Sequence, residues 1–134
     1  PMPLRTSSCA FSAIPIGNES RIAITVKFLG IMKEISRMVK YGDAEKERSG
    51  RTIATIKTIS SNEPSQVAAI KVEENKIVLV NAPHLHDILA TLEVIATNKN
   101  GNLFFKNKPV KVGESFVFSS FYTISGIITD ITFL

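Results

Sequence analysis

The sequence lacks the residues and motifs that disulfide-bonded domains, zinc sites and the commonest enzyme families require. It has one cysteine, Cys9, and no tryptophan among its 134 residues. One cysteine excludes an intrachain disulfide, and no Cys/His cluster has the spacing of a structural zinc site. P-loop, G-x-G-x-x-G and G-x-S-x-G motifs are absent, which removes the commonest nucleotide-binding and serine-hydrolase signatures. We therefore expect a protein that is not an enzyme and that carries no cofactor.

Long apolar runs and a strong charge of one sign are lacking too. No apolar run approaches the roughly 18 residues of a membrane-spanning helix, so we expect no membrane span in this chain. Sixteen Lys/Arg against twelve Asp/Glu give a net charge of +4, a balance that bears on solubility more than on partners. With 44% hydrophobic and 21% charged residues, the composition is that of one globular domain with a core of its own.

The first twenty residues differ from everything that follows. Prolines, serines and a glycine run through PMPLRTSSCAFSAIPIGNES, and only Arg5 and Glu19 are charged. The segment has no basic start followed by an apolar core, so we expect no signal peptide in it. We interpret residues 1–20 as an extended N-terminal arm and residues 21–134 as a single β-rich domain.

Self-association is the role that we expect for this arm. Burial of its large apolar side chains contributes less free energy than the loss of backbone entropy costs when twenty residues are ordered. Hydrogen bonds to an exposed sheet edge would supply the rest. We expect a homo-oligomer in which the arm runs along another subunit and builds a ring or a filament. The apolar residues concerned are Leu4, Phe11, Ile14 and Ile16.

Beyond the arm, the hydrophobic pattern predicts strands and one helix. Arg21–Phe28 alternates as a half-buried strand does, and apolar residues then recur at helical spacing from Ile31 to Val39. We expect Gly42 to cap the C-terminus of this helix. A loop is expected over Ser60–Gln66 and a strand break at Asn81-Ala82-Pro83. About nine short strands with one short helix predict a mainly β fold, a compact barrel or sandwich. The expected strands include Thr52–Ile59, Val67–Val72, Lys76–Val80, Ile88–Thr97, Asn102–Lys106, Glu114–Phe118 and Tyr122–Ile131. The alternation along them predicts a buried core of seven residues, namely Ile24, Val26, Ile56, Leu92, Val94, Ile128 and Ile131.

A weak internal repeat runs through this domain. The segment Val39–Asp43 resembles Val110–Glu114 at an offset of 71 residues (110 − 39), and the pair Ile24/Val26 is matched with Leu92/Val94. Downstream, Ile56 and Ile59 match Ile128 and Ile131. Two such halves would close a barrel around a pseudo-twofold axis, with Gly42 and Gly113 in turns at positive φ. Chance is the alternative, because V-K-x-G is common between strands.

The turn and strand motifs resemble domain of unknown function 4330, an uncharacterised prokaryotic family. They are Ile31 to Gly42-Asp43, Ser49–Ile59, His86–Leu92, Asn100–Phe105, Pro109–Gly113 and Tyr122–Ile131. The resemblance implies a β-rich domain with no established activity that usually follows an N-terminal membrane helix. It favours a place in the cell envelope or outside the cell. The arm departs from that plan, because residues 1–20 cannot span a bilayer.

One cluster has metal-ligating side chains. In an extended segment His84 and His86 project from the same face beside Asp87 and would share a metal with a third ligand. The simpler interpretation is a polar loop that leads into a strand after Pro83.

A basic stretch supports a second function class. It lies beside Phe104 and Phe105, an arrangement that binds anionic polymers such as nucleic acid or glycan. The simpler interpretation is that lysines protect hairpin edges from aggregation. The stretch consists of Lys99, Lys106, Lys108 and Lys111. The leading expectation remains a non-enzymatic structural module that self-associates in a cell-envelope or extracellular assembly, with polymer binding as the alternative.

Overall fold

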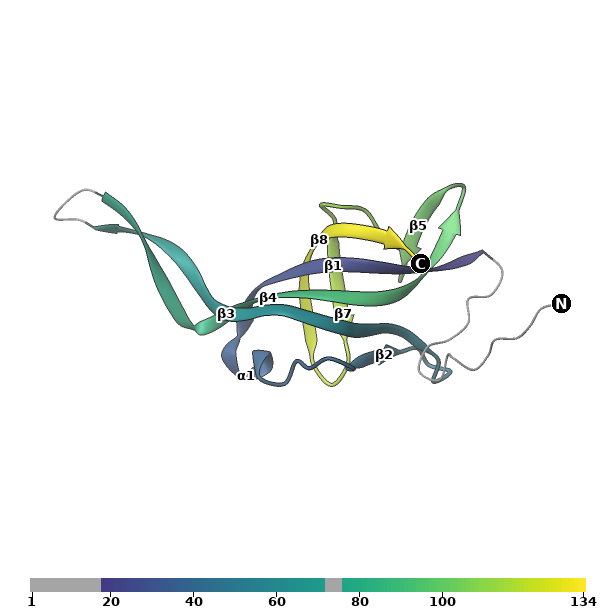
Figure 1. Ribbon diagram of the computed structural model, residues 1–134, viewed down its shortest axis with the longest axis horizontal. Coiled ribbons are helices and arrows are strands. Elements are labelled where there is room, and N and C mark those ends of the chain that lie inside the picture. Colours follow the sequence, from purple (N-terminus) through teal and green to yellow (C-terminus); the bar gives the residue numbers. More distant parts are fainter. Residues whose placement is uncertain (1–17, 72–75) are drawn as a thin grey trace.

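The computed structural model describes residues 18–71 and 76–134. They form one antiparallel sheet of eight strands and a single short helix (Figure 1). In chain order the elements are β1 (Glu19–Met32), α1 (Lys33–Ser36), β2 (Ala44–Lys46), β3 (Thr52–Lys71), β4 (Lys76–Lys99), β5 (Asn102–Phe105), β6 (Lys108–Pro109), β7 (Ser115–Ser119) and β8 (Thr123–Phe133). The predicted mainly β fold with one short helix is confirmed.

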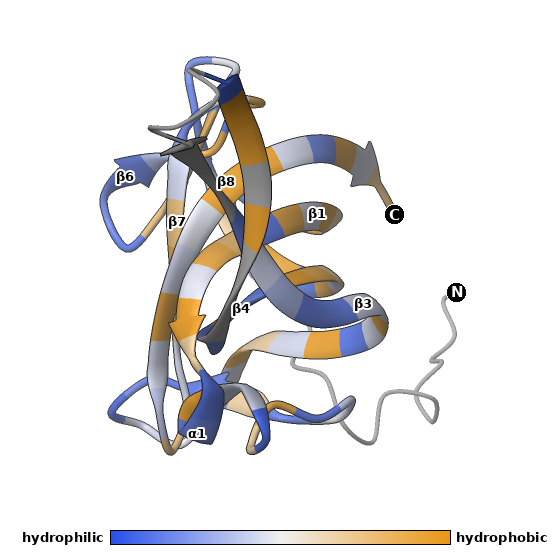
Figure 2. Ribbon diagram, turned by 90° about the vertical axis from the view of Figure 1, so that its left-hand side faces the viewer, coloured by the Kyte–Doolittle hydropathy of each residue, from blue (hydrophilic) through white to orange (hydrophobic). Residues whose placement is uncertain are grey.

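The sheet curls into a half-barrel with the order β2-β3-β4-β1-β8-β7, and β5 pairs with β4 and β6 (Figure 2). Alternation along the strands places the core inside the curl. On β1 the side chains of Ile22, Ile24, Val26 and Phe28 are fully buried, while Lys27 is exposed. A strand with one buried face has this two-residue period.

The core predicted from these alternations is largely confirmed. Six of the seven residues expected inside are almost completely buried: Ile24, Val26, Ile56, Leu92, Val94 and Ile128. The seventh, Ile131, is half-buried and packs against the core from the end of β8.

The predicted loop and the predicted strand break are both wrong. Residues 60–66 belong to β3, and residues 81–83 belong to β4. The turn-forming residues act through irregular pairing instead, because the partner in β4 changes from His86 to Ala82 between Pro64 and Ser65. A proline that donates no hydrogen bond is tolerated at such a bulge on an outer strand, so it bends the hairpin without ending it.

The predicted helix is shorter than its apolar stripe. Ile31 belongs to β1 and not to the helix, which spans only Lys33–Ser36. No side chain caps the first turn of the helix. An uncapped turn with few tertiary contacts has little to extend it. Gly42 does not cap a helix; it lies in a turn at φ 93°.

The predicted repeat is confirmed as a pseudo-twofold relation between two halves. The strand order reads the same from either end once β1 is matched with β4, β2 with β7 and β3 with β8. The two glycine turns match in detail. Gly42 N donates to Ile56 O and Gly113 N donates to Ile128 O, each at 2.8 Å, and both glycines have positive φ, 93° and 96°.

The upstream part of the repeat alignment needs a correction. Ile128 pairs with Val26, and its counterpart Ile56 pairs with Leu92. Val26 therefore corresponds to Leu92 and not to Val94, which is an offset of 66 residues (92 − 26). Sequence alternation alone left a shift of one residue pair open, because strands repeat every two residues. The pseudo-twofold axis passes between Thr25 and Thr91, which pair with each other and have hydroxyl oxygens 3.4 Å apart.

Within the described residues, no helix has the length and apolar character needed to cross a membrane.

Candidate interaction surfaces

The feature that stands out from the half-barrel is the outer part of the β3–β4 hairpin. Here Ser65–Lys71 pairs with Lys76–Ala82, from Ser65↔Ala82 to Lys71↔Lys76. We call these two segments the ribbon. It projects from one end of the long axis, away from the other strands (Figure 1). Strands β1 and β2 pair with β4 and β3 only closer to the body, so no third described strand covers either outer edge of the ribbon.

The ribbon exposes apolar side chains to solvent. Ile77 is 74% exposed and Val80 is 41% exposed. The sequence around them, VAAIK in one strand and KIVLV in the other, contains no acidic residue. An exposed edge of apolar, β-prone sequence is a template for pairing with another strand. A two-stranded hairpin by itself is marginally stable in water, so pairing with a further strand would stabilise the ribbon.

The root of the ribbon is held by polar side chains that include two of the predicted metal ligands. Asp87 Oδ1 accepts hydrogen bonds from Ser65 Oγ (2.6 Å) and from Gly30 N (3.0 Å). Gly30 lies in the irregular stretch of β1 between Phe28 and Ile31, at φ 65°. The hydrogen bond from Ser65, with that from Gly30, lowers the pKa of Asp87. Asp87 therefore fixes the ribbon to β1.

The predicted histidines are engaged differently. His86 Nδ1 lies 2.7 Å from Asn62 Oδ1, and Asn62 Nδ2 donates to Ser36 O at 3.0 Å. This chain of bonds connects β4, β3 and the end of α1. His84 is exposed. In the part of the chain that is described, no three His, Cys, Asp or Glu side chains gather closely enough to hold a metal ion.

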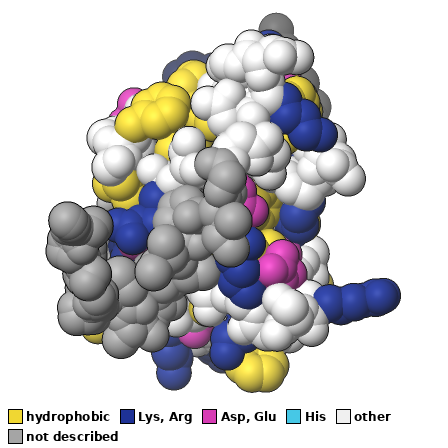
Figure 3. All heavy atoms as spheres, turned by 90° about the vertical axis from the view of Figure 1, so that its right-hand side faces the viewer, with side chains coloured by type: hydrophobic (Ala, Val, Ile, Leu, Met, Phe, Trp, Pro, Cys, Tyr) yellow, Lys and Arg dark blue, Asp and Glu magenta, His cyan; other side chains and the backbone are white. Residues whose placement is uncertain are grey.

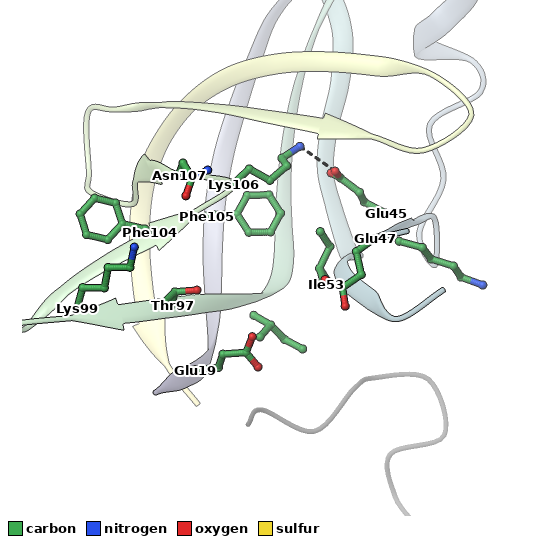
Figure 4. A pocket seen from close by; sticks show the side chains of 12 residues that line it. Glu19, Glu45, Glu47, Ile53, Thr97, Lys99, Phe104, Phe105, Lys106 and Asn107 are labelled. Carbon is green, nitrogen blue, oxygen red and sulfur yellow. Dashed lines mark hydrogen bonds and ion pairs between the residues drawn. The ribbon is translucent and has the colours of Figure 1, made fainter. Parts of the chain in front are cut away.

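The predicted basic stretch does not act as one free surface. Lys106 Nζ donates to Glu45 Oε2 at 2.8 Å and to Val117 O at 3.1 Å (Figure 4). Its charge is therefore neutralised by a carboxylate that is itself 7% exposed. Lys99 Nζ lies 5.8 Å from the centroid of the Phe104 ring, while Lys108 and Lys111 are exposed.

The neighbouring aromatic residues divide between inside and outside, as adjacent positions on a strand must. Phe105 is buried and stacks on Phe116 with ring centroids 5.1 Å apart, whereas Phe104 is half-buried. In Figure 3, which faces the end where β1 begins, Lys and Arg side chains are scattered over the visible described surface.

A cleft of about 370 Å³ opens at this end of the molecule. Its walls include Glu19, Glu45, Thr97, Phe104 and Lys106 (Figure 4). The carboxylates in it are paired, since Glu19 accepts hydrogen bonds from the guanidinium of Arg51 and Glu45 accepts from Lys106. The cleft therefore presents balanced charge and offers no concentrated field to an ionic ligand.

Sequence reasoning missed Glu45. Its Oε1 also accepts a hydrogen bond from Ser119 N at 3.0 Å, so one side chain connects β2 with β7 and with the residue that follows β5. The signal was available, because Glu45 stands at the repeat position of the buried Phe116 (116 − 45 = 71). A carboxylate at an inward position needs a cation or an amide partner.

The apolar residues of the predicted arm, Leu4, Phe11, Ile14 and Ile16, lie outside the described residues. Comparison with known proteins adds no relative: the chain matches no protein-family model, no curated protein and no solved structure. The resemblance to domain of unknown function 4330 stays a prediction.

Proposed function

We propose that this protein is a non-enzymatic structural module that self-associates and that its ribbon is the surface through which copies join. The observation that carries the proposal is the pair of uncovered strands, Ser65–Lys71 and Lys76–Ala82, projecting from a well-packed body. Strand addition satisfies a row of backbone amides and carbonyls at once. The family resemblance supports a setting in the cell envelope or outside the cell.

Exposure on the ribbon supports the same function. Ile77 and Val80 are exposed to solvent, whereas hydrogen bonds of Asp87, Ser65 and Asn62 hold the root of the ribbon in place. A projecting element with a braced base presents its edge in a fixed direction. Fixed presentation reduces the ordering that association would otherwise require.

The test is the oligomeric state of a ribbon variant, Ile77→Lys with Val80→Lys. A matched control is Tyr41→Lys with Ile127→Lys, because these residues are 76% and 41% exposed and the added charge is the same. By sedimentation velocity we expect the wild type and the control to assemble and the ribbon variant to remain a monomer near 14.7 kDa. Assembly of the ribbon variant to the extent seen for the wild type would overturn the proposal.

Binding of an anionic polymer is a second candidate function. It is supported by Lys99, Lys108 and Lys111, which lie on or beside the β5–β6 hairpin and form no ion pair with a described residue. Titration of a fluorescent single-stranded oligonucleotide at increasing salt tests it. Three phosphate contacts give a slope of log K against log salt of about −2. Binding that is unchanged in the triple Lys→Ala variant counts against this function.

A further inference from the structure

The first described residue, Asn18, lies at the end of the molecule opposite the ribbon. Asn18 O accepts a hydrogen bond from Asn98 N at 2.8 Å, and Glu19 pairs with Thr97. The ribbon projects from the other end of the long axis (Figure 1). The seventeen residues before Asn18 therefore start far from the uncovered edges.

The segment Phe11–Glu19 is too short to reach the ribbon of the same chain. From Thr97 to Ala82, where the ribbon begins, β4 runs 15 residue steps (97 − 82), or about 50 Å along the strand. From Glu19 back to Phe11 there are 8 steps (19 − 11), which span at most about 29 Å when fully extended. The apolar segment Phe11–Ile16 therefore cannot lie on the ribbon of its own chain.

The same segment has the composition of an added strand. Residues 11–16 read FSAIPI, six residues without a charge, and each ribbon strand is seven residues long with no third described strand paired beside it. Ile14 and Ile16 are two positions apart and would share one face of such a strand. Pro15 lacks an amide hydrogen but is tolerated in a strand whose outer side faces solvent.

We propose that residues 11–16 of one copy pair as an extra strand with the ribbon of the next copy. This inference rests on the proposed function and gives it a donor and a direction. Each copy then donates at the end where β1 starts and accepts at the end where the ribbon projects. Such a contact is head-to-tail, and repetition closes a ring or extends a filament, depending on the rotation between neighbours.

The experiment mixes two variants that are each defective on one side. A chain that starts at Asn18 lacks the donor, and it keeps the whole buried core, which lies between Ile22 and Ile128. The ribbon variant Ile77→Lys with Val80→Lys lacks the acceptor and keeps the donor. We expect each alone to be monomeric and an equimolar mixture to form a 1:1 dimer by light scattering.

Each result separates the inference from the function on which it rests. If the chain starting at Asn18 assembles like the wild type while the ribbon variant is monomeric, the ribbon pairs with itself and the inference is overturned. If both variants are monomeric and the mixture forms no dimer, the head-to-tail contact is wrong. Assembly of the ribbon variant overturns the proposed function itself.

A full-length pair of variants confirms that the segment acts through its apolar residues. Phe11→Asp with Ile14→Asp and Ile16→Asp should abolish assembly, because three charges cannot be placed against an apolar edge. The control places the same three charges outside the segment, as Thr6→Asp with Ser7→Asp and Ser8→Asp, and should assemble like the wild type. Equal assembly of the two variants would refute the role of residues 11–16.

Discussion

The two halves of the sheet share one frame and differ in what is inserted into it. Between β1 and the turn at Gly42 the first half has helix α1, whereas between β4 and the turn at Gly113 the second half has the β5–β6 hairpin. Val39 and Val110 occupy equivalent positions before the two turns and are both buried. The turns and the central strand pairs therefore preserve the architecture, and the insertions make the halves distinct.

A second difference lies where β2 and β7 complete the sheet. Phe116 in β7 stacks on Phe105, while its counterpart Glu45 in β2 pairs with Lys106, the next residue along. The end of the hairpin from the second half therefore contacts both positions, one through an aromatic ring and one through a charge. The ion pair between Glu45 and Lys106 needs both charges in place, so it specifies the pairing of these elements more strictly than the apolar contact between Phe105 and Phe116 does.

The largest loss of stability should come from a pair of equivalent positions at which one half does not tolerate the residue of the other half. Gly126 in β8 corresponds to Ala54 in β3 (126 − 54 = 72), but a Cβ on Gly126 would lie 2.8 Å from Phe28 Cα and closer still to Lys27 O. These are backbone atoms of β1, which cannot move aside as a flexible side chain does, so Gly126→Ala should cost about 3 kcal/mol. The reverse change, Ala54→Gly, should cost about 1 kcal/mol. Urea denaturation of both variants measures this, and equal costs would contradict the close approach.

Removal of Glu45 should have the next largest effect. Glu45→Ala leaves Ser119 N without its acceptor and Lys106 without its carboxylate. Loss of the acceptor for a partly buried amide costs about 1–3 kcal/mol, and the half-exposed lysine adds less because water can solvate it. Chemical denaturation gives the free energy of unfolding. The control Glu47→Ala removes a more exposed carboxylate and should cost little, so a similar loss in both would assign the effect to charge alone.

Much of this frame could be predicted from the sequence, because its signals are local. Alternation identified the buried face of β1 and β4, and a glycine before an acidic residue identified both turns. Alternation cannot give the register between distant strands. The sequence pattern therefore matches Val26 with Val94, whereas in the structure Val26 is equivalent to Leu92. The continuity of β3 through Pro64 was missed for a related reason, since the bulge there depends on β4.

The candidate surfaces divide in the same way. The stretch from Lys99 to Lys111 was visible in the sequence, but the neutralisation of Lys106 depends on Glu45, which is 61 positions away. The cluster around His86 and Asp87 was also visible, although its role in fixing the ribbon depends on Asn62, Ser65 and Gly30. The candidate residues can be identified from the sequence, but their hydrogen-bond and ion-pair partners are distant in the chain and are known only from the fold.

The two glycine turns provide a prediction in which the halves should behave alike. Gly42 and Gly113 have φ of 93° and 96°, and a Cβ at either would meet nothing within 4 Å. Only backbone strain opposes a side chain there, so Gly42→Ala and Gly113→Ala should each destabilise the fold by about 1–2 kcal/mol. Thermal unfolding of the two variants measures the costs. Costs that differ by more than about 1 kcal/mol would mean that the turns are not equivalent in energy.

The smallest effect should appear at low pH and concerns one pair of equivalent positions. Asp87 corresponds to Arg21 (87 − 21 = 66), and the latter forms a 3.0 Å ion pair with Glu93. Asp87 instead accepts from Ser65 and Gly30, which lowers its pKa in the folded state. A carboxyl whose folded pKa is depressed contributes stability above its unfolded pKa, near 3.9, and that stability is lost as pH falls through the folded value. Below pH 4 the wild type should therefore lose stability more steeply than Asp87→Asn, by less than about 1 kcal/mol because the group is partly solvated. Denaturation curves from pH 6 to pH 2 test this against Asp130→Asn at an exposed site. An acid transition that is identical in wild type and Asp87→Asn would show that the hydrogen bonds at the root of the ribbon do not stabilise the charged carboxylate.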